Sequence, residues 1–320
     1  MTPVSQPSRL KLGLAFAAIW IIWGSTYLGI AIGLNTIPPF ALAAARFLVA
    51  APIMYAYARY SGADNPTPAQ WRWTALLGFL FFVIGNGVVV FVEQRVSSGL
   101  TALLVAMVSV WTAIIEWVKP QGKAPTWAVA TGIVLGFVGA ALLLLPVGGG
   151  ADVVPTFEAT LLIFSTFAWA LASVLSKSAD LPKATSMTAA AEMIWGALGL
   201  SLMALVTGDW TRVSPSHIGT TGVLAVLYLA VFGSLVAFTC FAWLLKVSTP
   251  GKVSTAGYIN PMVAVALGWA FHSEVLTTRS LVASAVIVVG VALIITGENL
   301  TRARQPKAGK AAAKALTQEA

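Results

Sequence analysis

Apolar runs alternate with short polar or Pro/Gly-rich breaks along almost the whole chain. Runs of about 20 residues form helices long enough to cross the hydrocarbon core of a bilayer. The pattern predicts ten such helices, at approximately residues 12–34, 39–58, 72–92, 98–118, 126–146, 156–176, 186–206, 219–244, 253–271 and 280–297. Because every connection between them is short, we expect an all-α integral membrane protein with no inserted soluble domain.

The composition supports this interpretation. Of 320 residues, 58% are hydrophobic and only 9% are charged, whereas a soluble domain carries roughly 25% charged residues. The mean hydropathy is +0.86. A soluble fold of this size would have too few polar residues to cover its surface, so a membrane protein is indicated. The first apolar run, 12–34, exceeds the apolar core of a cleavable signal peptide, and we expect it to remain as the first span.

Lys and Arg residues set the expected orientation, because cytoplasmic loops carry the positive excess. If the N-terminus is cytoplasmic, the outer segments contain only Arg95, Arg212 and Arg279. The inner segments then contain Arg9, Lys11, Arg59, Arg72, Lys119, Lys123, Lys177, Lys183, Lys246, Lys252, Arg302, Arg304, Lys307, Lys310 and Lys314. The protein is therefore expected in a bacterial-type inner membrane with both termini in the cytoplasm. The net charge of +8 follows from this topology and does not require a nucleic-acid partner.

The two halves of the chain resemble each other. At an offset of 146 residues, "AAAR" ending at Arg46 aligns with "AAAE" ending at Glu192, and Trp23 aligns with Trp169. Five spans per half is an odd number, so the second half must enter the membrane from the opposite side. The sequence predicts two inverted five-helix repeats, at 12–149 and 150–298, with a cytoplasmic segment 1–11 and a basic cytoplasmic tail 299–320. Inverted repeats are common in alternating-access transporters, whose substrate site lies near the midplane between them.

Two ionisable residues lie at equivalent positions of the two repeats. Arg46 lies in the outer half of span 2 and Glu192 in the inner half of span 7. An arginine at the centre of a membrane helix costs ~2.5–3.5 kcal/mol on insertion scales, and intramembrane charges usually face the bundle interior, where they find partners or mark substrate paths. Either residue contacts substrate, or each is satisfied by helix carbonyls and polar neighbours; the sequence leaves both interpretations open.

Further polar and aromatic positions are candidates for a central cavity. Glu93 lies two helical turns after Asn86, on the same face of span 3, although an interfacial carboxylate is the alternative. In span 9, Pro261 removes a helix hydrogen bond and is a candidate hinge. Deep tryptophans offer rings that can stack on a substrate, with plain packing as the alternative. The predicted substrate-binding set is Trp23, Tyr27, Arg46, Asn86, Glu93, Trp111, Trp169, Ser173, Glu192, Tyr258 and Asn260.

Metal, cofactor and enzyme chemistry are not expected. Cys240 is the single cysteine, which excludes an internal disulfide and a cysteine metal cluster. His217 and His272 lie far apart without ligand-like spacing. The chain has no Walker A, GxSxG or HExxH motif. Direct use of ATP is therefore not expected, and any active transport would depend on a gradient or a partner.

Several motifs resemble a known family. "WGSTYLGIAIG" in span 1, "AAARFLVAAP" in span 2, "VSSGLTALLVAMVSVWTAI" in span 4, "YINPMVAVALGWAFHSEVLT" across span 9 and "VIVVGVALIITG" in span 10 are similar to the EamA family of the drug/metabolite transporter superfamily. The resemblance implies ten helices in two inverted repeats and export of small metabolites. The chain departs from the family pattern at Ser109, where proline is frequent, and at Gly122, where a glutamate would match Glu274. For Glu274 itself, the resemblance suggests helix capping or loop pairing.

Together, these observations predict a secondary transporter that exports small metabolites, such as amino acids or aromatic compounds, by alternating access. Broad drug or organic-cation efflux is one alternative. A membrane enzyme or lipid-handling protein is an alternative from another class. The expected partners are a small-molecule substrate and membrane lipids, with the protein either a monomer or a homodimer.

Overall fold

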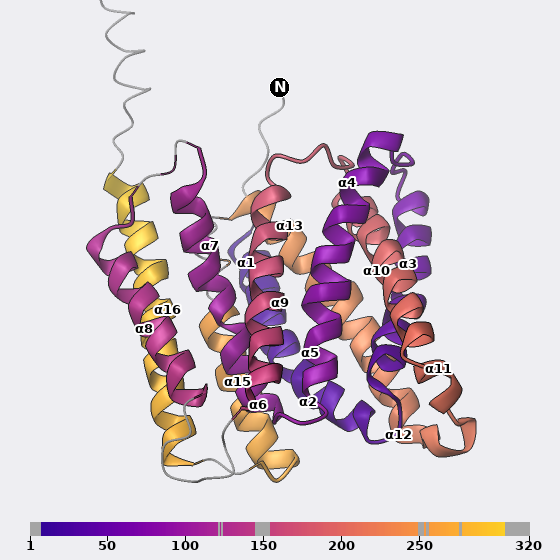
Figure 1. Ribbon diagram of the computed structural model, residues 1–320. Coiled ribbons are helices and arrows are strands. Elements are labelled where there is room, and N and C mark those ends of the chain that lie inside the picture. Colours follow the sequence, from indigo (N-terminus) through magenta and orange to yellow (C-terminus); the bar gives the residue numbers. More distant parts are fainter. Residues whose placement is uncertain are drawn as a thin grey trace, which may run out of the picture.

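The protein is a bundle of long helices (Figure 1). Its computed structural model describes residues 8–120, 122, 124–144, 154–248, 253, 256–274 and 277–304, and these contain no strand. The elements of the first half are α1 (Arg9–Ala17), the π-helix η1 (Ala18–Ile22), α2 (Trp23–Leu34), α3 (Pro39–Tyr60), α4 (Pro68–Gly78), the π-helix η2 (Phe79–Asn86), α5 (Gly87–Val92), α6 (Ser98–Val105), α7 (Met107–Val118) and α8 (Trp127–Leu144). Those of the second half are α9 (Thr156–Leu175), α10 (Thr185–Val206), α11 (Asp209–Arg212), α12 (Pro215–Tyr228), the π-helix η3 (Leu229–Phe238), α13 (Thr239–Val247), α15 (Ala256–Phe271) and α16 (Thr278–Arg304).

These elements join into ten segments that correspond to the predicted spans. Within the described residues, eight helical segments are long and apolar enough to cross a membrane. Two further apolar helices, Trp127–Leu143 and Ile259–Phe271, are shorter. The prediction of an all-α integral membrane protein with ten helices is confirmed.

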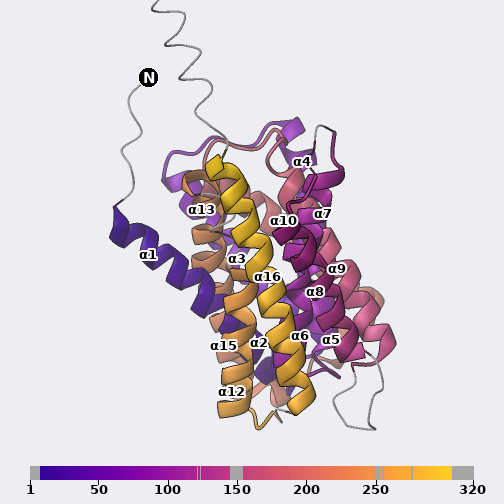
Figure 2. The ribbon, with the colours of Figure 1, turned by 90° about the vertical axis from the view of Figure 1, so that its left-hand side faces the viewer.

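The two halves run in opposite directions through the bundle. α1 starts near the end drawn at the top of Figure 1, whereas α9 starts at the opposite end. Ion pairs agree with this: Glu158 at the start of α9 meets Arg95, which follows α5, and Lys177, just past α9, meets Glu116 of α7. The start of α1 and the end of α16 lie toward the same end (Figures 1 and 2), which we call the upper end. The linker between the halves and the tail beyond Arg304 lie outside the described residues.

Equivalent helices of the two halves pack together. α3 packs along α10, and α8 packs along α16 (Figure 2). The second pair approaches closely where two glycines face each other: a Cβ built on Gly132 would lie 2.4 Å from the carbonyl oxygen of Gly290. Small residues of this kind let membrane helices approach backbone to backbone, where van der Waals contacts hold them together. α8 and α16 thus form one side of the bundle.

Three π-helical stretches interrupt the first, third and eighth segments, and the sequence analysis did not predict them. A π-helix leaves backbone groups with altered partners, and side chains from other segments meet them here. The Trp23 indole Nε1 donates to the Gly233 carbonyl in η3 (3.1 Å). With its nitrogen turned toward η1, the Asn260 amide donates to the carbonyls of Ile19 (3.0 Å) and Trp20 (3.1 Å). Both bonds join segments that are distant in the sequence, and they end on the backbone of η3 and η1.

The fourth segment is also divided. α6 ends at Val105 and α7 begins at Met107, with the turn at Ala106. The break lies one turn before Ser109, the position at which the family frequently carries proline. The absence of proline therefore does not make this segment a continuous helix.

Candidate functional site

A cavity of about 200 Å³ lies between the two halves, in the middle of the bundle. Helices from both repeats line it, including α2, α3, η2, α7, α9, η3 and α15. The predicted residues that it brings together are Trp23, Tyr27, Arg46, Asn86, Trp169, Ser173, Asn260 and the candidate hinge Pro261. Most of the set chosen from sequence therefore meets at one place.

Arg46 reaches the cavity from α3 and is only 5% exposed. Its Nε donates to the Ser234 hydroxyl (2.7 Å), and that hydroxyl in turn donates to the Leu229 carbonyl of η3 (3.2 Å). The guanidinium also lies over the ring of Phe47, 4.9 Å from its centroid. No hydrogen bond joins its two terminal nitrogens to a described residue. Ser234 thus fixes one edge of a planar fork whose other donors are available to an anion.

Aromatic rings form much of the wall. Trp23 and Trp169, the aligned pair from the two halves, meet edge to face with centroids 6.1 Å apart. Trp23 also lies 5.0 Å from Phe241, and Trp169 lies 4.9 Å from Phe81. Such pairs are favourable arrangements of aromatic quadrupoles. They give the cavity a stiff apolar surface beside the arginine.

The polar lining residues differ in what they offer a ligand. The Asn86 side-chain oxygen has no hydrogen-bond partner among the described residues, so it is a candidate acceptor. The Ser173 hydroxyl instead donates to the Trp169 carbonyl in its own helix (2.8 Å). Asn260 is engaged by the η1 carbonyls. Asn86 is therefore the polar side chain most available beside Arg46.

Three predicted site residues are not among the described residues that line this cavity. Among the residues described as lining it, Glu93, Trp111 and Glu192 do not occur. Glu192 is buried in α10, and Trp111 lies edge to face with Phe137 and Phe167. Tyr258 belongs to α15, but its side chain lies outside the described residues. The shared helix face of Asn86 and Glu93 did not suffice because Glu93 follows the end of α5 and lies beyond the cavity.

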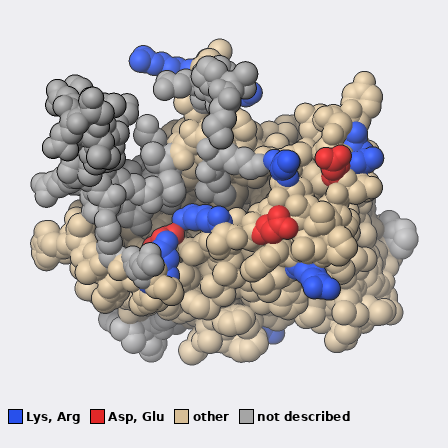
Figure 3. Space-filling model, turned by 90° about the horizontal axis from the view of Figure 1, so that it is seen from above, with Lys and Arg blue, Asp and Glu red and all other residues tan. Residues whose placement is uncertain are grey.

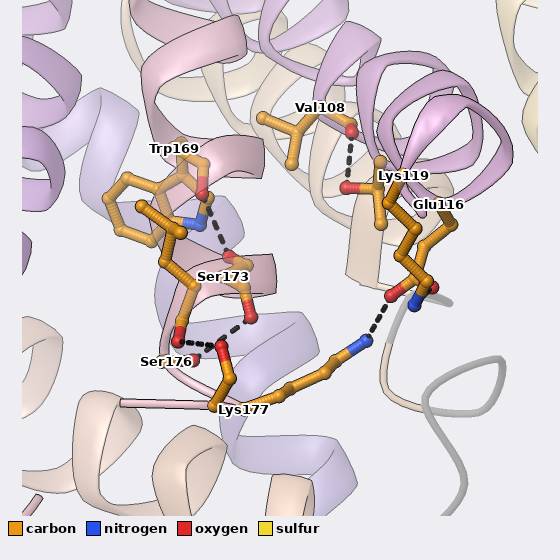
Figure 4. Close-up of polar contacts among 10 residues, drawn as sticks. Val108, Glu116, Lys119, Trp169, Ser173, Ser176 and Lys177 are labelled. Atoms are coloured by element: carbon orange, nitrogen blue, oxygen red, sulfur yellow. Dashed lines mark hydrogen bonds and ion pairs between the residues drawn. The ribbon is translucent and has the colours of Figure 1, made fainter. Parts of the chain in front are cut away.

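The cavity extends toward the upper end. Its lining continues from Trp169 through Ser173 to Lys177, just beyond α9. Figure 4 shows Lys177 extended toward Glu116 of α7, which it meets at 2.7 Å, while Glu116 also pairs with Lys119. These side chains are partly exposed, and Lys and Arg residues are spread over this upper face (Figure 3). An exposed ion pair of this kind contributes about 0–1 kcal/mol, so it holds the upper end only weakly.

At the lower end, three carboxylates of the second half, none of them in the predicted site, contact the first half. Asp209 accepts from the Phe40 N–H (2.7 Å) at the start of α3, and Glu274 accepts from the Ser98 (2.8 Å) and Gly99 (3.1 Å) N–H groups at the start of α6. Glu158 pairs with Arg95 at 2.9 Å. Negative charge at a helix N-terminus satisfies unpaired N–H groups and the helix dipole. The Glu274 contacts agree with the capping suggested by the family resemblance.

Comparison with known proteins agrees with this architecture. A family model described as the EamA-like transporter family matches residues 11–145 and again residues 156–296. The chain belongs to this family. It is 33% identical over 297 residues to the inner membrane transporter YedA of Escherichia coli (strain K12), an alignment that covers 92% of this chain and 94% of YedA.

More distant relatives extend the comparison. The chain is 24% identical over 304 residues to a probable amino-acid metabolite efflux pump of Salmonella typhimurium, covering 91% of this chain and 97% of the pump. A crystal structure with 18% identity superposes with a TM-score of 0.65, covering 92% of this chain and 99% of the other. Its low identity supports the fold alone. The EamA-like chain is thus a multi-pass inner-membrane transporter, and the family does not point to an enzyme.

Proposed function

We propose that this EamA-like transporter exports small carboxylate-bearing metabolites, with amino acids as the best candidates. Arg46 is the observation that carries the proposal: a buried guanidinium faces the cavity with its Nε held by Ser234 and its remaining donors free of hydrogen bonds to described residues. A carboxylate can take two parallel hydrogen bonds from such a fork. A bound anion would also offset part of the cost of burying this charge.

The charge of the lining supports an anionic group over a cation. Arg46 and Lys177 are the charged side chains among the described residues that line the cavity, and no carboxylate occurs there. An organic cation would meet positive charge without a compensating acid. The broad cation efflux considered from the sequence is therefore less well supported than transport of a carboxylate.

The remaining lining fits an amino acid. The unpaired Asn86 oxygen can accept from an ammonium group, and Trp23 and Trp169 offer apolar surface for a side chain. A cavity of this kind, mostly apolar with a few polar groups that fix orientation, is typical of small-molecule sites. The printed name of the Salmonella relative, an amino-acid metabolite efflux pump, points in the same direction.

The end toward which the cavity extends supports export as the direction of transport. The segments with the positive excess lie at the upper end, and the positive-inside rule assigns that end to the cytoplasm. The cavity extends to this end while the lower end is closed, a state suited to loading from the cytoplasm. In this proposal the repeats 12–149 and 150–298 rock about the cavity with Pro261 as a hinge, and segments 1–11 and 299–320 stay cytoplasmic.

A binding and flux comparison tests the proposal. Purified protein is titrated with amino acids and aromatic cations, and flux is measured in proteoliposomes. We expect Arg46→Gln to weaken binding of carboxylate-bearing substrates about 10- to 100-fold, as the loss of a charge-assisted hydrogen bond of ~1.5–3 kcal/mol implies. Arg59→Gln is the matched control, because Arg59 is exposed and donates to the Ala63 carbonyl away from the cavity. Equal affinity in wild type and Arg46→Gln, or tighter binding of cations than of carboxylates, would contradict the proposal.

A further inference from the structure

Glu93 is a buried acid that the cavity does not use. It follows α5 at the lower end, and it is only 8% exposed. Neither of its carboxyl oxygens has a hydrogen-bond partner among the described residues. A buried ionised carboxylate without donors is strongly disfavoured, so its charge must be neutralised in this closed state.

The electrostatic surroundings of Glu93 make an ionised form still less favourable. Glu274 is near enough to repel a charge on Glu93, and its own oxygens accept from two N–H groups at the start of α6. Tyr27, which lines the cavity, is also within electrostatic reach of Glu93. Glu93 thus lies between the cavity floor and the acid that closes the lower end.

Two further buried oxygens lie on the same side of the bundle without partners. The Ser98 and Thr101 hydroxyls are 1% and 0% exposed by residue and make no hydrogen bond to any described residue. They are one turn apart on α6, which packs against α2 and α15. Ser98 Oγ and Glu274 Oε2 both lie within 3.0 Å of the position that a Cβ on Gly268 would occupy. The interior beside Glu274 therefore holds a group of polar oxygens with unused hydrogen-bonding capacity.

No described cation compensates Glu93. The titratable residue at the start of α9 is Glu158, which forms an ion pair with Arg95. The first turns of α3, from Pro39 to Ala45, have no titratable side chain. The stretch η2 and helix α6 also have no charged residue. Tyr27 and Glu274 are thus the titratable groups that act on Glu93 from its surroundings.

We propose that Glu93 is a proton-binding site of the closed lower end: it carries a proton while Glu274 caps α6 and releases it when that contact opens to water. Opening the lower end removes Glu274 from the Ser98 and Gly99 N–H groups and hydrates the Glu93 carboxyl. Release of the proton is thereby linked to exposure of the cavity on that side. The proposal depends on the alternating-access assignment and not on the identity of the substrate.

Infrared difference spectroscopy and thermal unfolding test this site without any substrate. In nanodiscs at neutral pH, wild type is expected to show a protonated-carboxyl band that Glu93→Gln loses. The melting temperature of wild type is expected to fall as pH rises, in part because Glu93 ionises. Glutamine mimics the neutral acid, so this part of the fall should be absent in the variant. The sign follows because ionising Glu93 destabilises the closed state, so the stabilising effect of its proton is lost as pH rises.

Glu116→Gln is the matched control, because Glu116 is paired with two lysines at the upper end. It should keep both the band and the pH dependence. If Glu93→Gln fails to fold, Glu93→Asp, which keeps a carboxyl group, is expected to retain a protonated band at a shifted frequency. Identical spectra and pH profiles in wild type and Glu93→Gln would overturn the proposal. NaCl could stabilise wild type more than choline chloride does, and Glu93→Gln could lose this effect without a change in the carboxyl band. That result would overturn the proton proposal in favour of a metal cation bound at Glu93. Either result can occur whether or not Arg46 binds carboxylates, so the two proposals fail separately.

Discussion

Replacing Asp209 by alanine should lower the free energy of unfolding by removing a contact at the lower end, and the structure gives the size of the effect. α3 begins at Pro39, and Pro38, the residue before it, has no side chain that can cap the helix. Asp209, whose residue is 0% exposed, supplies the missing acceptor: its Oδ2 lies 2.7 Å from the Phe40 nitrogen and 3.4 Å from the Ala41 nitrogen. The short bond to a charged acceptor is worth ~1.5–3 kcal/mol, and the long one adds little.

The ion pair between Asp209 and Arg212 adds little to this sum. The Arg212 side chain is 59% exposed, and exposed pairs contribute about 0–1 kcal/mol. We therefore expect Asp209→Ala to lower the free energy of unfolding by ~2 kcal/mol, dominated by the uncapped Phe40 N–H. Asp209→Asn should lose less, about 1 kcal/mol or below, because asparagine caps a helix nearly as well as aspartate.

Unfolding in mixed micelles with increasing SDS, followed by tryptophan fluorescence, measures these differences. Asp64→Ala is the control, because Asp64 is exposed and makes no hydrogen bond to a described residue; its effect should stay within ~0.5 kcal/mol. If Asp209→Asn loses as much as Asp209→Ala, or if neither differs from wild type, the capping argument is refuted.

Three other substitutions probe the site and the packing. Ser234→Ala should weaken carboxylate binding by less than Arg46→Gln, because it removes only the acceptor that orients Arg46 Nε; equal losses in titrations would show that Ser234 does more than orient. Asn86→Ala should weaken binding of amino acids but leave that of matched carboxylic acids lacking the amino group unchanged, and equal loss for both would rule out an ammonium contact. Gly132→Leu should destabilise the α8–α16 pair by ~1–3 kcal/mol or more through overpacking against Gly290; unfolding at the wild-type SDS fraction would contradict the close approach.

The ten helices could be predicted from the sequence because membrane length and apolar composition are local properties. The inverted arrangement followed from the odd number of spans in each half. The same internal alignment matched Trp23 with Trp169, and the structure brings these rings together. Asn86 and Ser234 both line the cavity, although the sequence analysis did not include Ser234 in the site.

Other features depend on contacts that no local pattern contains. Two of the π-helices, η3 and η1, accept hydrogen bonds from Trp23 and Asn260, which lie in other segments. Asp209 and Glu158 lie in short, ordinary-looking polar stretches, and only the fold places them against Phe40 and Arg95. Helical periodicity placed Glu93 on the face of Asn86, but it could not show that the end of α5 lies below the cavity.

The acid caps of the lower end also bear on how the two repeats have diverged. Asp209 and Glu274 each join the second half to backbone N–H groups of the first, and the position aligned with Glu274 in the first half is Gly122. The two repeats are therefore no longer interchangeable, although they share an architecture. A chain made of two copies of the first repeat would have the helix starts that need caps without the Glu274 equivalent to supply one. When the halves are coexpressed as separate fragments, each half should pair with the other half in preference to a second copy of itself. Each repeat has therefore come to depend on the other for its folded structure.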